Sequence, residues 1–235
     1  MYRQILFDLD GTLSDPKIGI CTSVQYALSR MGIEEPDLDR LEPFIGPPLT
    51  DSFSEFYGMS EPEAKQAVQY YRERFSVIGK YGNELYPGID ELLSDLKADK
   101  RCVGIASSKP TVFVEDILAY FRIRPFFDVV CGSELNGTKN KKEEVLEEAL
   151  QMLFGKSGMG REDTVMVGDR KFDVEAADKL GVAGIAVSYG YGSVEELTKA
   201  GAKMIVSSVQ ELKEKLLGKQ INTKKETSCP DMDRM

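Results

Sequence analysis

Short apolar runs followed by helical patterns recur along most of this chain, and they constrain its fold more than any other feature. The runs are nearly continuous, which is typical of strands covered on both faces, and they occupy residues 3–8, 102–106, 127–131, 164–168, 182–187 and 203–206. Helical patterns follow or separate them at residues 88–98, 110–121, 142–153, 172–180, 193–200 and 208–217. This alternation predicts an α/β fold, a doubly wound parallel sheet with helices on both sides.

Residues 15–84 interrupt the alternation with helical spacing and no convincing strand. Ser60-Glu61-Pro62-Glu63 has the composition of a helix start, and we expect that helix to run to about Ile78. A segment of about seventy residues is too long for a loop. We therefore predict a core domain of residues 1–14 and 85–218, a small helical domain of residues 15–84 inserted after the first strand, and a flexible tail of residues 219–235.

Composition excludes several kinds of function. The chain has 235 residues, a net charge of −9 and no histidine, so nucleic acid is a poor partner and histidine-based catalysis is excluded. Its 4 cysteines lack the spacing of a zinc site. No signal-peptide pattern and no run of eighteen apolar residues is visible, which predicts a cytoplasmic protein with no membrane partner.

Acidic, hydroxyl and lysine side chains follow three of the predicted strands. The carboxyl ends of parallel strands meet at one edge of the sheet, where ligands bind in such folds. The first strand is followed by Asp8, Asp10 and Thr12, the second by Ser107, Ser108 and Lys109, and the fourth by Asp169 and Asp173. A lysine cluster, Lys139, Lys141 and Lys142, precedes the helix before that fourth strand. We expect these side chains to converge.

Asp8 and Asp10 lie two positions apart, so both leave the strand end on one face. Two adjacent carboxylates repel each other and raise each other's pKa unless a cation or acid–base chemistry uses them. Taken singly, Asp169 could be a turn residue, Asp173 an acid in a first helical turn, and Ser107 a helix cap. Their joint placement favours a site.

An all-oxygen acidic site favours a hard divalent ion, and Mg²⁺ suits one that also accepts phosphate. One carboxylate could attack phosphorus to form an aspartyl-phosphate, while a second protonates the leaving group and then activates water. A hydroxyl and a lysine could hold the phosphoryl oxygens as charge shifts in the transition state. These residue types therefore support phosphate transfer.

With these residues assembled, the chain resembles the phosphatase branch of the haloacid dehalogenase superfamily. Phe7-Asp8-Leu9-Asp10-Gly11-Thr12 is similar to its first motif, Ser107 to the second, a lysine to the third, and Gly168-Asp169 with Asp173 to the fourth. The family's usual third-motif signature is replaced here by Thr138-Lys139-Asn140-Lys141-Lys142. We assign Lys142 to the third motif and keep Lys141 as the alternative.

The resemblance implies a role for each residue. Asp8 would be the nucleophile and Asp10 the general acid and base, and Ser107 and Lys142 would bind the phosphoryl group. Mg²⁺ would be held by the Asp8 carboxylate, the Asp10 backbone carbonyl and Asp169, with Asp173 assisting through water. We expect further substrate contacts from Thr12, Ser108, Lys109 and Gly46.

The inserted helices correspond to the family's cap domain, which closes over the site. Phe44-Ile45-Gly46-Pro47-Pro48-Leu49 would carry a substrate-facing loop, although it could also be a simple helix connection. Arg74 is a further candidate to touch substrate. Turn residues at Ser14-Asp15-Pro16 and Tyr81-Gly82-Asn83 would serve as hinges.

Asp10 separates the chain from related dehalogenases, which lack that second aspartate. No cap lysine stands in a setting that marks a phosphonate hydrolase. The chain looks most like the phosphoglycolate phosphatase group, which includes nucleotidases, and this implies a Mg²⁺-dependent phosphomonoesterase for a small soluble phosphate. A phosphomutase, a pyrophosphatase and a regulator that binds a phosphorylated ligand without turnover stay open, as does the choice between monomer and homodimer.

Overall fold

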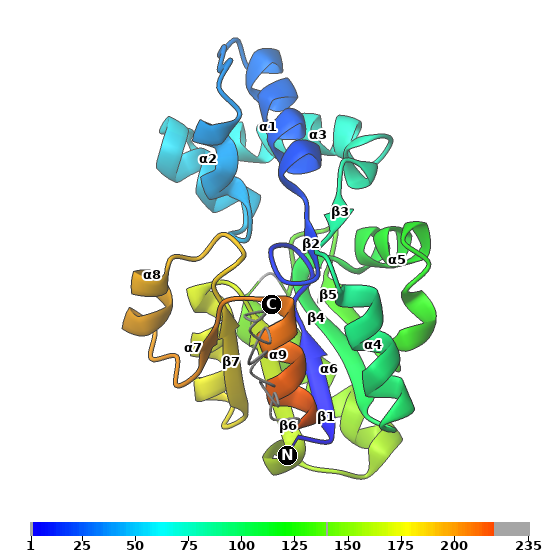
Figure 1. Cartoon of the computed structure of the whole chain (residues 1–235). Coiled ribbons are helices and arrows are strands. Elements are labelled where there is room, and N and C mark those ends of the chain that lie inside the picture. The colour runs from blue at the N-terminus through cyan, green and yellow to red at the C-terminus, as the bar shows by residue number, and fades with distance from the viewer. Residues whose placement is uncertain (1, 140, 219–235) are drawn as a thin grey trace, which may run out of the picture.

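The computed structural model describes residues 2–139 and 141–218. Within them, six strands form one parallel sheet in the order β5-β4-β1-β6-β7-β8 (Figure 1). The strands are β1 Gln4–Phe7, β4 Cys102–Pro110, β5 Val129–Ser133, β6 Thr164–Gly168, β7 Ala183–Val187 and β8 Ile205–Val206. The predicted α/β architecture is confirmed. The predicted tail, residues 219–235, lies outside the described residues.

Helices cover both faces of the sheet, because successive strand residues point to opposite sides. Ile5 and Phe7 pack with the helices of one face, and Leu6 packs with those of the other. The first face carries α4 Ile89–Ala98, α5 Thr111–Tyr120 and α9 Val209–Leu217, and the second carries α6 Lys142–Ser157 and α7 Lys171–Lys179. Helix α8, Val194–Lys199, packs through Leu197 beside α7. Short 3-10 turns occupy Arg124–Phe126 and Arg161–Asp163.

The helices within residues 15–84 form a separate layer beyond one end of the sheet, which we call the cap (Figure 1). It contains α1 Lys17–Arg30, α2 Leu49–Tyr57 and α3 Glu61–Phe75, with 3-10 turns at Asp39–Phe44 and Gly79–Tyr81. The cap has its own apolar core, which Phe113 of α5 joins from below. The domain boundaries themselves stay a prediction.

Several details differ from the expectation. The cap's two connections, β2 Ser14–Asp15 and β3 Glu84–Leu85, pair as a short antiparallel ribbon, although no strand was expected there. Strands of two residues are too short to show a periodicity. Helix α3 ends at Phe75 rather than Ile78, and β4 continues to Pro110, since pairing with β5 resumes after an irregularity at Ser107. None of the described helices is long and apolar enough to cross a membrane.

Candidate active site

The two N-terminal aspartates lie where β1 leaves the sheet. The Asp8 amide extends the ladder by donating to the Val167 carbonyl at 2.8 Å. A tight turn follows, in which Gly11 adopts φ +78° and its amide donates to the Ser14 carbonyl at 2.8 Å. Asp8 and Asp10 are only 6% and 8% exposed. The strand end thus places both carboxylates in a largely buried setting beneath the cap.

Asp169 and Asp173 meet Asp8 at the neighbouring end of β6. One carboxylate oxygen from each of the three residues lies within 4.8 Å of the others, and all three residues are buried. The Tyr191 amide donates to Asp169 Oδ2 at 2.8 Å, and the Arg170 amide donates to Asp173 Oδ2 at 3.1 Å. Backbone donors therefore orient both acids, Asp169 directly after β6 and Asp173 in the first turn of α7.

Glycines make room for these acids. A Cβ atom on Gly11 or Gly190 would overlap the Asp169 side chain, and one on Gly168 would overlap Asp173. These contacts bring the turn after β1, the end of β6 and the loop after β7 against one another. The three segments thereby enclose the acidic cluster.

Lys142 supplies the cluster with a positive charge. Its Nζ lies 2.8 Å from Asp8 Oδ1 and 2.7 Å from Asp173 Oδ1, and its side chain is 4% exposed. Lys141 instead precedes α6 on the surface, and Lys139 pairs with Glu134 and Glu148. Of the two lysines proposed from the sequence, the structure places Lys142 beside Asp8.

The electrostatics of the cluster favour a further cation. Burial raises the pKa of Asp169 well above its ordinary value, and the charges of Asp173 and Asp8 add to this. Burial and Asp8 likewise raise the pKa of Asp173 to about 6, against the opposing effect of Lys142. Although they are within ion-pair distance of Lys142, Asp8 Oδ1 and Asp173 Oδ1 accept no well-directed hydrogen bond from the described residues. Three acids with one lysine fit a divalent metal.

Asp10 lies apart from this cluster and pairs with Lys109. The Lys109 Nζ atom is 3.0 and 2.7 Å from the two Asp10 carboxylate oxygens. Burial raises the pKa of Asp10 in spite of this lysine. The Lys109 ammonium also stands 4.7 Å from the centre of the Phe75 ring in the cap. Asp10 therefore has the setting of a proton carrier, distinct from that of Asp8.

A cavity of about 150 Å³ opens between these residues and the cap. Its core end is polar, with Asp8, Asp10, Ser107, Ser108 and Lys109 among the lining residues. The cap end is mostly apolar, with Ile20, Phe44, Pro47, Pro48, Leu49, Val68, Tyr71 and Phe75. Gly46 lines it too, and its contact with substrate stays a prediction. The cavity thus joins a charged end to an apolar end.

Two predicted substrate contacts do not lie at the cavity. Thr12 is fully buried and donates its hydroxyl to Asp169 Oδ1 at 3.3 Å. Arg74 donates to the Thr22 carbonyl at 3.2 Å on another face of the cap. Arg72 lines the cavity instead, and its Nη1 donates to the Leu135 carbonyl at 2.7 Å. Residues two apart on a helix point about 200° apart, so the choice between these arginines depended on the rotation of α3.

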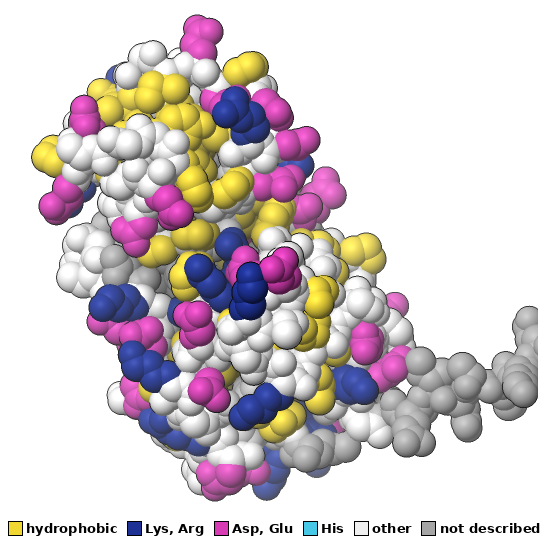
Figure 2. Space-filling model, turned by 90° about the vertical axis from the view of Figure 1, so that its left-hand side faces the viewer, with side chains coloured by type: hydrophobic (Ala, Val, Ile, Leu, Met, Phe, Trp, Pro, Cys, Tyr) yellow, Lys and Arg dark blue, Asp and Glu magenta, His cyan; other side chains and the backbone are white. Residues whose placement is uncertain are grey.

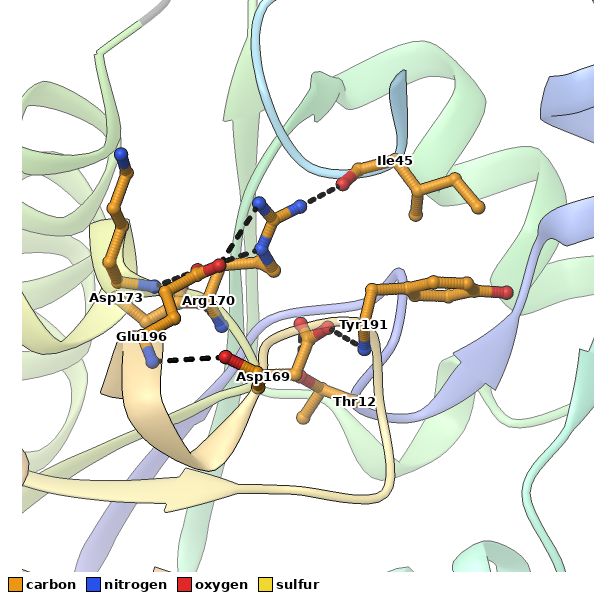
Figure 3. Close-up of polar contacts among 9 residues, drawn as sticks. Thr12, Ile45, Asp169, Arg170, Asp173, Tyr191 and Glu196 are labelled. Carbon is orange, nitrogen blue, oxygen red and sulfur yellow. Dashed lines mark hydrogen bonds and ion pairs between the residues drawn. The ribbon is translucent and has the colours of Figure 1, made fainter. Parts of the chain in front are cut away.

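Sequence reasoning also missed Arg170 and Tyr191, which join the acidic cluster to the cap (Figure 3). Arg170 donates to the Ile45 carbonyl, and the Tyr191 hydroxyl donates to Asp15 in the ribbon. The position of Arg170 directly after Asp169 was the one available signal.

Figure 2 shows apolar side chains on the cap above a junction where charged side chains of both signs gather.

Comparison with known proteins agrees with this geometry. Residues 5–187 match the haloacid dehalogenase-like hydrolase family. The chain belongs to this family. It is 48% identical to a 5'-nucleotidase of Pseudomonas aeruginosa, a match that covers 83% of this chain and 87% of the relative. It is 27% identical to a phosphoglycolate phosphatase of Photorhabdus laumondii, over 89% and 90% of the two chains.

A solved structure supports the same assignment. The crystal structure of a predicted phosphatase from Clostridium acetobutylicum superposes with a TM-score of 0.87 at 44% identity, covering 93% of this chain and 99% of that one. The prediction of an enzyme from the family's phosphatase branch is therefore confirmed.

Proposed function

We propose that this protein is a Mg²⁺-dependent phosphomonoesterase that hydrolyses a small soluble phosphate ester through an aspartyl-phosphate. The observation that carries the proposal is the separation of two carboxylates from one strand end. Asp8 faces the acid cluster and Lys142, whereas Asp10 faces Lys109. One carboxylate therefore has the setting of a nucleophile and the other that of an acid and base.

In the first step, Asp8 attacks phosphorus and the bond between phosphorus and the ester oxygen breaks. Asp10 gives its proton to that oxygen, which leaves as an alcohol. In the second step, Asp10 takes a proton from water as the water oxygen attacks phosphorus, so that orthophosphate leaves and Asp8 is regenerated. Ser107 and Lys142 would hold the phosphoryl oxygens.

Mg²⁺ would be held by the Asp8 and Asp169 carboxylates and the Asp10 backbone carbonyl, with Asp173 assisting through water. The ion would neutralise phosphoryl charge as it develops. The three clustered carboxylates support this assignment, because one lysine does not balance them.

The cavity lining bears on the substrate. Its cap end offers aromatic and aliphatic surface, as a sugar and base would need. We therefore favour a nucleoside monophosphate, in keeping with the name of the relative from Pseudomonas aeruginosa. Phosphoglycolate carries a carboxylate and would need a cation beyond the phosphate, for which Arg72 is placed. A cytoplasmic location and the oligomeric state stay predictions.

A phosphate-release assay tests the proposal with nucleoside monophosphates, phosphoglycolate, sugar phosphates, pyrophosphate and p-nitrophenyl phosphate, each with and without Mg²⁺. We expect Mg²⁺-dependent release that disappears in Asp8→Asn, whereas Asp90→Asn, on the exposed surface of α4, keeps full activity. Full activity in Asp8→Asn would contradict the assigned nucleophile. Transfer of phosphate to a second substrate hydroxyl without net release would indicate a phosphomutase instead.

A further inference from the structure

Arg170 links the end of β6 to the cap. Its guanidinium leaves the core directly after Asp169 and reaches the loop above (Figure 3). Nη1 donates to the Ile45 carbonyl, while Nε donates to Glu196 Oε1 at 2.9 Å. The Arg170 and Glu196 side chains are 14% and 23% exposed. A largely buried cation thus has one carboxylate partner in the core and one carbonyl partner in the cap.

The carbonyl that Arg170 binds belongs to the connection between the 3-10 turn ending at Phe44 and helix α2. Gly46 in this connection adopts φ +106°, and a Cβ there would lie 3.0 Å from Arg170 Nη1 and 3.1 Å from its Cγ. The backbone therefore rests directly on the arginine. Residues 46–50 line the cavity, so the contact holds a cavity wall against the core.

Glu196 fixes the direction of the guanidinium. The Lys171 amide also donates to Glu196 Oε1, at 2.9 Å, so the carboxylate is tied to the same turn that carries Arg170. A planar guanidinium can serve a carboxylate and a carbonyl at once with separate N–H groups, whereas a lysine ammonium lacks this fixed fork. The arrangement depends on arginine rather than on positive charge alone.

We propose that Arg170, oriented by Glu196, is a positioning residue that holds residues 45–49 of the cap over the reaction site. The inference rests on the proposed function, because its kinetic consequence concerns a phosphate ester. In the proposed reaction the phosphoryl group would contact core residues, while the organic part of the ester would contact the loop. Loss of the contact between Arg170 and the loop therefore weakens binding of the organic part and leaves the reacting groups in place.

Hydrogen–deuterium exchange of residues 41–53 tests the contact without any need for activity. We expect faster exchange in Arg170→Ala than in the wild type. Arg161→Ala is a matched control, since Arg161 also donates to a glutamate, Glu147, and to a carbonyl, Leu180, but entirely within the core. Unchanged exchange in Arg170→Ala, or an equal effect of Arg161→Ala, would overturn the proposal.

Kinetics then test the consequence. For the best ester found, we expect Arg170→Ala to raise KM about tenfold, the value for one charge-assisted hydrogen bond, with kcat changed less than threefold. Acetyl phosphate has almost no organic part for the loop to contact. Its KM and kcat in Arg170→Ala should therefore stay within threefold of the wild-type values. If Arg170→Ala does not fold, Arg170→Lys should raise KM in the same direction. A fall in kcat for both substrates at constant KM would contradict the positioning role.

The two tests fail in different ways. Absence of phosphate release from the wild-type protein would refute the proposed function, and exchange would still decide whether Arg170 holds the loop. Normal phosphatase activity with unchanged exchange in Arg170→Ala would refute the inference alone.

Discussion

Replacing Lys142 with methionine removes the lysine that pairs with both Asp8 and Asp173, and its effect follows from the distances of these two contacts. Each carboxylate oxygen lies 2.7–2.8 Å from Nζ. At an effective dielectric constant of about 20, each pair attracts by about 6 kcal/mol before the cost of desolvation. Removing one partner of a buried ion pair typically lowers the free energy of unfolding by about 3–5 kcal/mol.

We expect a cost of about 3 kcal/mol, because the remaining acids can take up protons. Burial raises the pKa of Asp169 and of Asp173, which makes that uptake easier once the lysine is gone. This cost is the difference in the free energy of unfolding between the wild type and Lys142→Met, measured with urea at pH 7 in the presence of a chelator. Adding Mg²⁺ should recover part of the loss, since the ion replaces the missing charge.

Lys141→Met is the matched control, because this neighbouring lysine is exposed. Its unfolding free energy should change by less than about 0.5 kcal/mol. Equal stability of the two variants, or a larger loss in Lys141→Met, would refute the reasoning. Lys141 would then be the better candidate for the third-motif lysine.

Three further predictions concern the acidic cluster. Gly11→Ala should weaken Mg²⁺ binding at least tenfold by calorimetry, since its Cβ overlaps Asp169, whereas Gly32→Ala has the same positive φ and open space and should bind normally. Mg²⁺ should raise the melting temperature of the wild type but not of Asp169→Asn. In metal-free protein, burial raises the pKa of Asp173 from its ordinary 3.8 to about 6. The neutral carboxyl therefore contributes to the free energy of unfolding fully below about pH 4, and this contribution is lost as the pH rises through 6. Asp173→Asn should flatten that part of the curve, and an unchanged slope would contradict the assignment.

Much of the fold was predictable because the strands are apolar on both faces and the helices are regularly spaced. The site was predictable in outline because Asp8, Asp10 and Asp169 follow strands that end at the same edge, and Ser107 lies in the last part of the neighbouring strand β4. The two-residue ribbon was not, since so short a pairing depends on where the two connections meet.

Side-chain direction set the other limit. Lys141 and Lys142 stand side by side in the sequence, and which one turns inward depends on where α6 begins. Arg170 and Ile45 are separated by 125 positions, so no local pattern reports their contact. Such pairings follow from how the cap rests on the sheet, which the chain's periodicity does not specify.

Trapping the covalent intermediate tests the central claim most directly. The enzyme would be mixed with substrate and Mg²⁺, quenched in acid during turnover and reduced with borohydride, which converts an aspartyl-phosphate to homoserine. Peptide mass spectrometry should then find homoserine at position 8 in the wild type and none in Asp8→Asn. Homoserine at another aspartate, or none at position 8 while phosphate is released, would contradict Asp8 as the nucleophile.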